Sequence, residues 1–240
     1  MTTEADLLDS NYPLMVKLRE VAPGTHNHSR NVAALLEAIG SELGLDVTKL
    51  SIAGHYHDIG KTVHPRFFSE NIQDGEKNPH DELEPWVSAR FITAHLADSV
   101  QILVNNHHVD RKIIEWVSQH HGTSLVRYFF TKSGANDERI YRYACTRPQS
   151  LEAALLMVCD SVEATTRSLS QAGRLGPIDE AVNTIIQGLI DDEQLDEAPL
   201  TVGNLRKVKE VLHRELASQF HKRVDYAKAA EEGKTNGDSA

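Results

Sequence analysis

Residues 55–61 read HYHDIGK, so two histidines, an aspartate and a lysine stand together within one short stretch. The apolar residues that precede it recur with helical spacing, and they place Leu50, Ala53 and His57 on one stripe. Imidazole and carboxylate groups are common ligands of divalent metals. One such cluster proves little by itself, so its meaning depends on whether distant His and Asp residues can converge on it.

The helical period continues along the chain, and no alternating strand, hairpin turn or internal repeat is visible. Capping residues and glycine stops then divide the chain into elements. We expect helices over 28–43, from Asp46 or Thr48 to Gly60, from Pro85 through His95, after Asp98, from Asp110 to the QHHG stretch at 119–122, from Ser150 onward, and near 179–190 and 201–220. The predicted fold class is therefore all-α, a helical bundle.

The composition limits the classes of function. The chain has 240 residues, of which 40% are hydrophobic, enough for the core of one domain. Its 25 basic and 35 acidic residues give a net charge of -10, which argues against binding long nucleic acid. A small phosphate ligand would need a local positive centre, and bound metal ions can supply one.

No targeting segment is visible in the sequence, and the cysteines are too few for a disulfide framework. The N-terminus lacks a basic stretch followed by an apolar run, and no run of 18 apolar residues occurs, so we expect a cytoplasmic protein without direct membrane insertion. The two cysteines, Cys145 and Cys159, are expected to be reduced thiols.

Histidines and aspartates recur on the apolar faces of the expected helices. A carboxylate in the apolar stretch LLMVCDSVEA is costly to bury unless it is paired or binds a metal. Seven residues from five helices could thus face one interior and hold two ions: His28, His57, Asp58, His95, His120, His121 and Asp160. Any one of these histidines, His95 for example, could instead be a core residue bonded to a backbone carbonyl, and Asp160 could pair with Arg167. Lys61 could be a solvated lysine at a helix end.

The ordered set of motifs resembles the HD-domain phosphohydrolases, named for their His-Asp doublet. It is most similar to the cytosolic HD domain of seven-transmembrane-receptor HD proteins, known as cyclic di-AMP phosphodiesterases. The resemblance runs from about Leu7 to Tyr226 through APGTHNHS, YHDIGK, FFSEN, NPHDEL, QHHGTSLVRYF, RPQSLEAA and DSVEATTRSL. It implies one HD domain over residues 1–226, with a linker-like segment at 1–22, extra C-terminal helices, and a disordered tail over 227–240.

The resemblance also implies a ligand for each position. His28, His57, Asp58 and Asp160 would bind one divalent ion, and Asp58 would bridge to a second ion held by His95, His120 and His121. Iron or manganese is favoured, with zinc as the alternative. The family usually has two adjacent histidines where this chain has Asn27-His28, and we take His28 as the ligand. His107 and His108 form a competing doublet, but they precede the Asp110 cap and so belong to a loop.

The implied activity is hydrolysis of a cyclic dinucleotide, cyclic di-AMP to pApA, by a metal-bridged hydroxide. Asp58 and Lys61 are the expected catalytic residues, the lysine steadying a phosphate oxygen or supporting the ligands. Arginines can bind phosphates and aromatic rings can stack on purines. The candidate substrate contacts are Arg66, His80, Arg127, Tyr128 and Arg147. Aromatic residues in the same segments could instead anchor loops to the core, and His80 could cap the helix at Pro85.

Other activities remain open at this point. A cyclic di-GMP phosphodiesterase of the HD-GYP type is disfavoured, because the stretch after the His pair reads HHGTSLVRYFF instead of the GYP signature. Hydrolysis of nucleoside phosphates, oxidation by a di-iron centre, and a non-catalytic nucleotide sensor are further alternatives. The chain could be a domain excised from a membrane receptor or a soluble relative, and the sequence leaves open whether it forms a homodimer.

Overall fold

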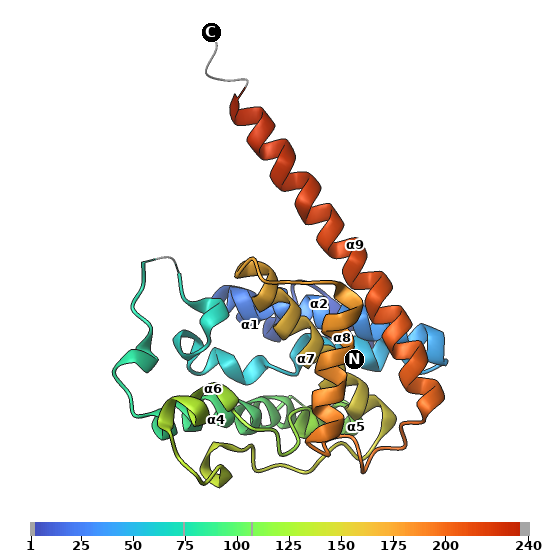
Figure 1. The fold of residues 1–240 in the computed structure, drawn as a ribbon. Coiled ribbons are helices and arrows are strands. Elements are labelled where there is room, and N and C mark those ends of the chain that lie inside the picture. Colours follow the sequence, from blue (N-terminus) through green and yellow to red (C-terminus); the bar gives the residue numbers. More distant parts are fainter. Residues whose placement is uncertain (1–2, 74, 107, 236–240) are drawn as a thin grey trace.

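The computed structural model describes residues 3–73, 75–106 and 108–235, and side chains as far as residue 219. Within these ranges the chain is helical, and its one extended pairing is an isolated bridge between Leu125 and Arg142. The α-helices are α1 (Pro13–Val21), α2 (Pro23–Leu43), α3 (Val47–Tyr56), α4 (Pro85–Val104), α5 (Arg111–Gln119), α6 (Arg127–Ser133), α7 (Leu151–Gln171), α8 (Ile178–Asp191) and α9 (Val202–Thr235) (Figure 1). The all-α prediction is confirmed.

Short 3-10 turns fill much of the remaining chain. They are η1 (Glu4–Leu8), η2 (Ile59–Thr62), η3 (Pro65–Phe67), η4 (Ser69–Asn71), η5 (Pro79–Asp81) and η6 (Arg139–Tyr141). Four of them, η2 to η5, lie in the segment that connects α3 to α4. This segment contacts α1, α2 and α4, so it packs on the bundle instead of looping away from it.

Helix α7 forms the centre of the main core. Its residues from Ala153 to Cys159 are all buried, and α2, α3, α5 and α8 pack against it. Burying the leucine, isoleucine and valine side chains of these helices is the dominant favourable term in folding. Because the first half of α7 is apolar over two turns, the ionisable residues that come next in the same helix, Asp160 and Glu163, lie deep in the molecule.

Several predicted helix ends are confirmed. The side chains of Asp46, Asp110 and Ser150 accept backbone N–H bonds at the starts of α3, α5 and α7. Gly44 follows α2 in the left-handed conformation, with φ of 69°.

Two predicted boundaries are wrong. A separate helix after Asp98 does not exist, because α4 continues without a break from Pro85 to Val104. Aspartate is tolerated inside a helix when its neighbours pack well, so it was a poor stop signal. The helix expected to reach Gly60 ends at Tyr56, and His57 and Asp58 form the junction between α3 and η2. The directions of the His57 and Asp58 side chains are therefore set by this junction, and not by the rotation of about 100° per residue in an α-helix.

The C-terminal boundary stays a prediction. Helix α9 extends through residues 227–235, which were expected in the disordered tail, and residues 236–240 lie outside the described residues. In the part of the chain that the structure describes, no helix combines the length and apolar character that crossing a membrane requires. The cytoplasmic location is not tested by this finding.

Candidate metal centre

The seven predicted ligand residues come together at one place in the structure. They form two groups of four, and within each group one ligand atom from every residue lies within 4.8 Å of the others. The first group is His28, His57, Asp58 and Asp160, and the second is Asp58, His95, His120 and His121. Asp58 belongs to both groups, and the partition is the one that the resemblance implied.

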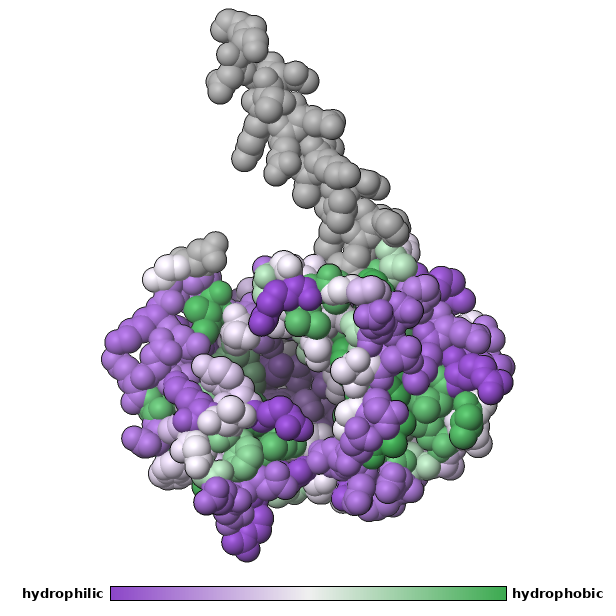
Figure 2. Space-filling model, in the orientation of Figure 1, coloured by the Kyte–Doolittle hydropathy of each residue, from purple (hydrophilic) through white to green (hydrophobic). Residues whose placement is uncertain are grey.

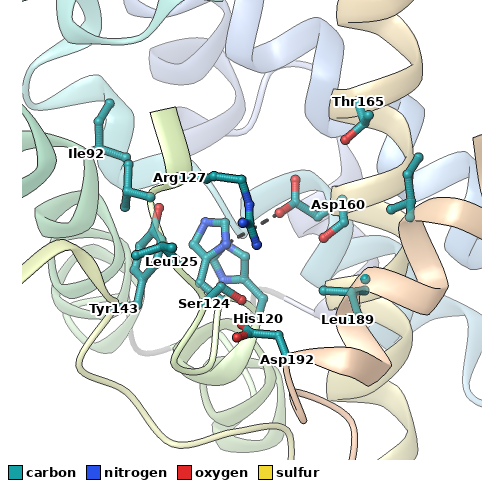
Figure 3. A pocket seen from close by; sticks show the side chains of 15 residues that line it. Ile92, His120, Ser124, Leu125, Arg127, Tyr143, Asp160, Thr165, Leu189 and Asp192 are labelled. Atoms are coloured by element: carbon teal, nitrogen blue, oxygen red, sulfur yellow. Dashed lines mark ion pairs between the residues drawn. The ribbon is translucent and has the colours of Figure 1, made fainter. Parts of the chain in front are cut away.

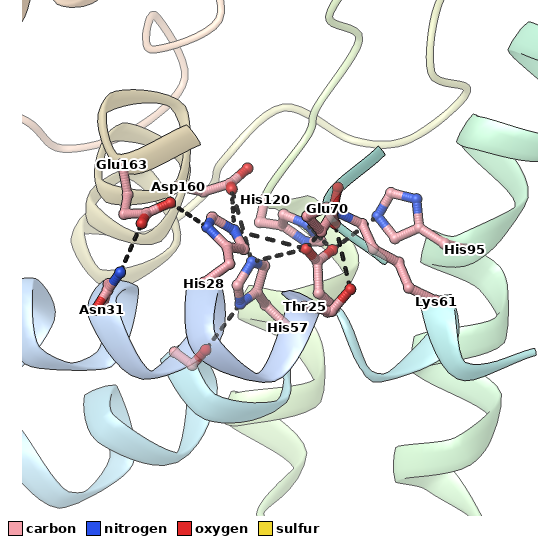
Figure 4. A network of polar contacts seen from close by, with 12 residues as sticks. Thr25, His28, Asn31, His57, Lys61, Glu70, His95, His120, Asp160 and Glu163 are labelled. Carbon is pink, nitrogen blue, oxygen red and sulfur yellow. Dashed lines mark hydrogen bonds and ion pairs between the residues drawn. The ribbon is translucent and has the colours of Figure 1, made fainter. Parts of the chain in front are cut away.

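The two carboxylate oxygens of Asp58 face different groups. Oδ2 lies 3.4 Å from Nε2 of His57 and 3.7 Å from Nε2 of His28. Oδ1 lies 3.1 Å from Nε2 of His95 and 3.8 Å from Nε2 of His120. A carboxylate placed in this way can bridge two ions. Figure 4 shows the rings of His28, His57, His120 and His95 gathered at this centre.

Backbone carbonyls fix the orientation of three of the rings. Nδ1 of His57 donates to Gly54, Nδ1 of His95 to Ile92, and Nδ1 of His120 to Val117. Each bond keeps a proton on Nδ1 and directs Nε2 toward Asp58. His95 is therefore both the carbonyl-bonded core histidine of one hypothesis and the inward-facing candidate ligand of the other.

Unpaired buried atoms show that the centre fits metal ions. Among the described residues, Nε2 of His57, Nε2 of His120 and Oδ1 of Asp58 are buried and have no hydrogen-bond partner. Such atoms are costly to bury unless something binds them. Nitrogen and carboxylate donors in two adjoining groups suit divalent ions of the first transition row.

His28 is held differently, by a glutamate that the sequence analysis missed. Glu163 is 2% exposed and its Oε2 bonds Nδ1 of His28, while Nε2 of His28 lies 3.0 Å from Oδ1 of Asp160. Asn31 and Arg167 donate to the same glutamate, at 2.8 and 3.2 Å. Arg167 thus pairs with Glu163 and not with Asp160. The available signal was spacing: Glu163 stands three residues after Asp160 on the same helix face.

Lys61 is buried beside the shared aspartate. Its Nζ lies 2.7 Å from Oδ2 of Asp58 and 2.9 Å from Oε1 of Glu70, and its side chain is 14% exposed. It also stands 4.9 Å from the ring centre of Phe68. The hypothesis of a solvated helix-end lysine is wrong, because both of its partners are buried carboxylates. Lys61 supports a ligand, and a contact with substrate stays a prediction.

The glycine of HYHDIGK lets the ligand-bearing segments approach one another. A Cβ on Gly60 would lie 2.1 Å from the carbonyl oxygen of His95 and 2.4 Å from the nitrogen of Ser99. Its N–H donates to Oγ of Ser99 at 2.8 Å. Only glycine permits this contact between η2 and α4, which brings Asp58 next to His95.

The electrostatics of the centre favour a charged carboxylate at Asp58 and neutral imidazoles at His120 and His121. Burial would raise the pKa of Asp58, but the charges of Lys61 and His57 outweigh it and hold that pKa well below its usual value. Burial, together with the charge of His57, lowers the pKa of His120 to about 3. Burial likewise lowers the pKa of His121. His120 and His121 are thus unprotonated at neutral pH, as metal ligands must be.

Two cavities adjoin the centre. One, of about 410 Å³, is lined on one side by Leu125, Arg127 and Tyr143 and on the other by Leu189 and Asp192. Figure 3 shows Asp160 and His120 between these two sides. The other cavity, of about 270 Å³, is lined by Lys61, Glu70, Arg167 and their neighbours. Both include Ile92, His121, Tyr143 and Asp160, so the metal centre lies between them. In Figure 2 the visible face is hollowed near its middle, with hydrophilic side chains in the depth.

The predicted substrate residues are not all brought to these cavities. Arg127 lines the larger one, and Arg66, His80, Tyr128 and Arg147 line neither. His80 is buried, and its Nε2 bonds the carbonyl of Phe67 at 2.8 Å. Arg147 pairs with Glu193 at 3.2 Å, and Tyr128 is 69% exposed. Their roles as substrate contacts stay predictions, and the lining of the larger cavity favours Arg127.

Two further residues at the cavities were not predicted as site residues. Tyr143 stacks on His121 with ring centres 4.3 Å apart, which fits the hypothesis that aromatic residues of this segment anchor loops. Glu70 joins Lys61 to Oγ1 of Thr25 at the start of α2. His108 of the competing doublet is exposed, and His107 lies outside the described residues.

A model of the HD domain matches residues 25–165, more than half of the chain. The chain belongs to the HD-domain family. It is 36% identical over 225 residues to cyclic-di-AMP phosphodiesterase PgpH of Listeria monocytogenes serotype 1/2a (strain 10403S), covering 92% of this chain and 31% of the relative. It is 35% identical over 237 residues to cyclic-di-AMP phosphodiesterase PgpH of Bacillus subtilis (strain 168), with shares of 95% and 32%. The chain spans about a third of the length of these curated relatives.

Solved structures of an HD domain have the same fold. The crystal structure of the L. monocytogenes phosphodiesterase PgpH HD domain matches with a TM-score of 0.80 and 36% identity. The match covers 88% of this chain and 100% of that chain. The structure of that HD domain in complex with cyclic-di-AMP gives the same TM-score over 88% of this chain and 99% of the other. The predicted resemblance to HD proteins of this type is confirmed.

Proposed function

We propose that this HD-domain chain is a metal-dependent phosphodiesterase that hydrolyses a cyclic dinucleotide, with cyclic di-AMP as substrate and pApA as product. The observation that carries the proposal is the pair of four-residue ligand groups that share Asp58. The choice of substrate is supported by the PgpH relatives and by the related HD domain solved with cyclic-di-AMP.

The metals in this proposal are two divalent ions, iron or manganese in preference to zinc. His28, His57, Asp58 and Asp160 would hold one, and Asp58, His95, His120 and His121 the other. Bound ions supply positive charge that attracts a phosphodiester and activates water as a nucleophile. Two ions carry four positive charges, and the ionised Asp58 and Asp160 cancel only two.

The chain's own residues would orient the substrate along the two cavities. Placing one phosphodiester over the centre leaves the rest of a cyclic dinucleotide to extend toward either side. On the larger side Arg127 can bind a phosphate, and Leu125, Val126 and Leu189 can contact a base. On the smaller side Arg167 borders the cavity, although its charge is shared with Glu163.

The substrate is tested by giving manganese-loaded protein equal amounts of cyclic di-AMP and cyclic di-GMP and following both by chromatography. Conversion of cyclic di-AMP to pApA, with cyclic di-GMP consumed slowly or not at all, supports the proposal. Preference for cyclic di-GMP would contradict the substrate. Consumption of neither, with metal still bound, would contradict the activity and favour a nucleotidase or an oxygenase.

The metal centre is tested separately by Asp58→Ala. We expect this variant to lose both bound metal and hydrolysis, because one carboxylate serves both groups. Asp179→Ala, on the exposed start of α8, is the matched control and is expected to keep both. Metal content and activity retained in Asp58→Ala would contradict the shared site.

A further inference from the structure

The turn that follows the His120-His121 pair is held by side chains from two distant segments. The backbone N–H of Thr123 donates to Oε1 of Gln194 at 2.9 Å. Its carbonyl accepts from Nη1 of Arg142 at 2.8 Å. Both backbone polar groups of one residue, two positions after His121, are therefore fixed by side chains instead of by a helix or strand.

These side chains are joined into a closed ring of bonds. Nε2 of Gln194 donates to Oγ1 of Thr123 at 2.9 Å and to the carbonyl of Asp192 at 2.9 Å. Arg142 donates to both carboxylate oxygens of Asp192, at 2.8 and 3.1 Å. We call Thr123, Arg142, Asp192 and Gln194 the Thr123 clamp. Gln194 is 0% exposed, so its amide is removed from water and depends on these partners.

The backbone has a positive φ on both sides of the contact between Gln194 and Thr123. Glu193, next to Gln194, has φ of 56°, the one positive value of a non-glycine residue among those described. Such a conformation is unfavourable for a residue with a Cβ and persists only when its surroundings enforce it. On the other side, Gly122 has φ of 50°, and a Cβ there would lie 2.5 Å from Oε1 of Gln194.

The clamp links the metal centre to a part of the chain outside the family match. Asp192 and Gln194 lie in the turn between α8 and α9, after residue 165 where the HD match ends. Asp192 lines the larger cavity together with Ser124 and His120, and Figure 3 labels all three. Arg142 comes from the segment that also carries Tyr143, which stacks on His121.

We propose that the Thr123 clamp positions His120 and His121 as ligands, so that the turn between α8 and α9 controls the second ligand group. Gln194 and Asp192 are then positioning residues, which act on the second group through Thr123 and Arg142 and make no contact with the metal. The first group, which draws on α2, the junction after α3, and α7, is independent of the clamp. The proposal rests on the proposed function in one respect, the binding of metal by both groups.

The test is titration of Mn²⁺ into metal-free Gln194→Leu by calorimetry, with metal content measured after desalting. Leucine is similar in size to glutamine but can neither donate nor accept a hydrogen bond. We expect one of two binding events to be unchanged and the other to lose about 10-fold in affinity, the lower end for residues that support metal ligands. Gln187→Leu is the matched control, because Gln187 is exposed on α8 and its side chain donates to Asp191, away from the clamp.

Equal metal affinities in Gln194→Leu and wild type would overturn the proposal, even if the melting temperature falls, since a merely structural role moves stability alone. Asp192→Asn provides a milder variant if Gln194→Leu does not fold, because it keeps the shape but weakens the bond to Arg142. We expect a smaller weakening of the same event, and no change would again overturn the clamp. Loss of metal in these variants, in a protein that hydrolyses no cyclic dinucleotide, would contradict the proposed function and support the clamp.

Discussion

Nζ of Lys61 lies 2.7 Å from Oδ2 of Asp58, the carboxylate that both ligand groups share. Asp58 is 1% exposed, and the second partner of the lysine, Glu70, is also largely buried. Burial acts to lower the pKa of Lys61, but the charges of Asp58 and Glu70 outweigh it and raise that pKa above its usual value. The lysine therefore stays charged and compensates Asp58 before any metal binds.

Lys61→Met should destabilise the metal-free protein more than the metal-loaded protein. Removing one partner of a buried ion pair leaves an uncompensated charge and costs about 3 kcal/mol. Bound metal supplies positive charge to Asp58, so it should recover part of this loss. Urea unfolding with and without Mn²⁺ measures the free energy of unfolding of the metal-loaded and the metal-free protein.

Lys77→Met is the control for this substitution. Lys77 pairs with Glu82 on the surface, where the two side chains are 66% and 70% exposed, and such pairs contribute about 1 kcal/mol or less. Equal losses for Lys61→Met with and without metal would show that the lysine does not compensate Asp58.

Glu163→Gln should weaken metal binding at the first ligand group. Among the described residues, His28 is the one candidate ligand whose Nδ1 forms a hydrogen bond with a carboxylate. A carboxylate partner makes the opposite ring nitrogen, Nε2, a stronger electron-pair donor to a metal ion. Glutamine keeps the shape but loses the charge, so we expect about 10-fold lower affinity in one of two binding events. Calorimetric titration with Mn²⁺ measures this change.

The control for Glu163→Gln is Glu180→Gln, an exposed position in the first turn of α8. If both glutamine variants bind metal like the wild type, the carboxylate on His28 has no part in holding the ion.

The convergence of the seven candidate ligand residues could be predicted from their combination in the sequence, although a histidine such as His95 has no distinctive signal by itself. His57 and Asp58 stand in a recognisable motif, and Asp160 is conspicuous in an apolar stretch where an unpaired carboxylate would be costly. The expected caps at Asp110 and Ser150 were read from local chemistry that acts within one turn. Signals of this kind need no knowledge of what lies across the molecule.

The supporting residues could not be predicted in the same way. Glu70 and Gln194 are ordinary polar residues in their local sequence, and their importance comes from partners 9 residues away in one case and 71 in the other. The predicted contacts at Arg66 and Arg147 relied on residue type alone, and type does not say which way a loop turns. The end of α3 at Tyr56 was missed because the junction is set by packing of η2 on α4.

Gly60→Ala should both destabilise the protein and weaken the second ligand group. The added Cβ would lie within 2.4 Å of backbone atoms of α4, which cannot rotate away as a side chain can. Overpacking of this kind costs about 3 kcal/mol, and moving α4 would carry His95 away from Asp58. Thermal unfolding and metal content measure the two effects.

Gly188→Ala is the matched control for stability, since it lies within α8 and its Cβ would meet no atom within 4 Å. Alanine is favoured over glycine inside a helix, so this variant should be more stable by about 1 kcal/mol. A Gly60→Ala protein as stable as the wild type would show that the contact with α4 is looser than the structure describes.

Metal binding should release protons, and its affinity should rise with pH. Burial acts to lower the pKa of His57 in the metal-free protein, but the carboxylates of Asp58 and Asp160 outweigh it and raise that pKa to about 10. Near neutral pH His57 is therefore protonated without metal, whereas a ligand histidine must offer a free lone pair. Below a pH of about 10, lowering the pH by one unit should thus reduce the affinity for the metal ion by about tenfold, because one proton must be displaced from His57.

Calorimetry in two buffers of different ionisation enthalpy, repeated one pH unit apart, counts the protons released by Mn²⁺. Asp58→Ala gives the background, because it lacks the shared ligand and one source of the raised pKa. The expected result is an enthalpy that depends on the buffer and an affinity that falls with acidity, since protons and metal compete for the same nitrogen. An affinity that does not change between the two pH values would mean that His57 is already neutral in the metal-free protein, and that the carboxylates around it are balanced by Lys61 alone.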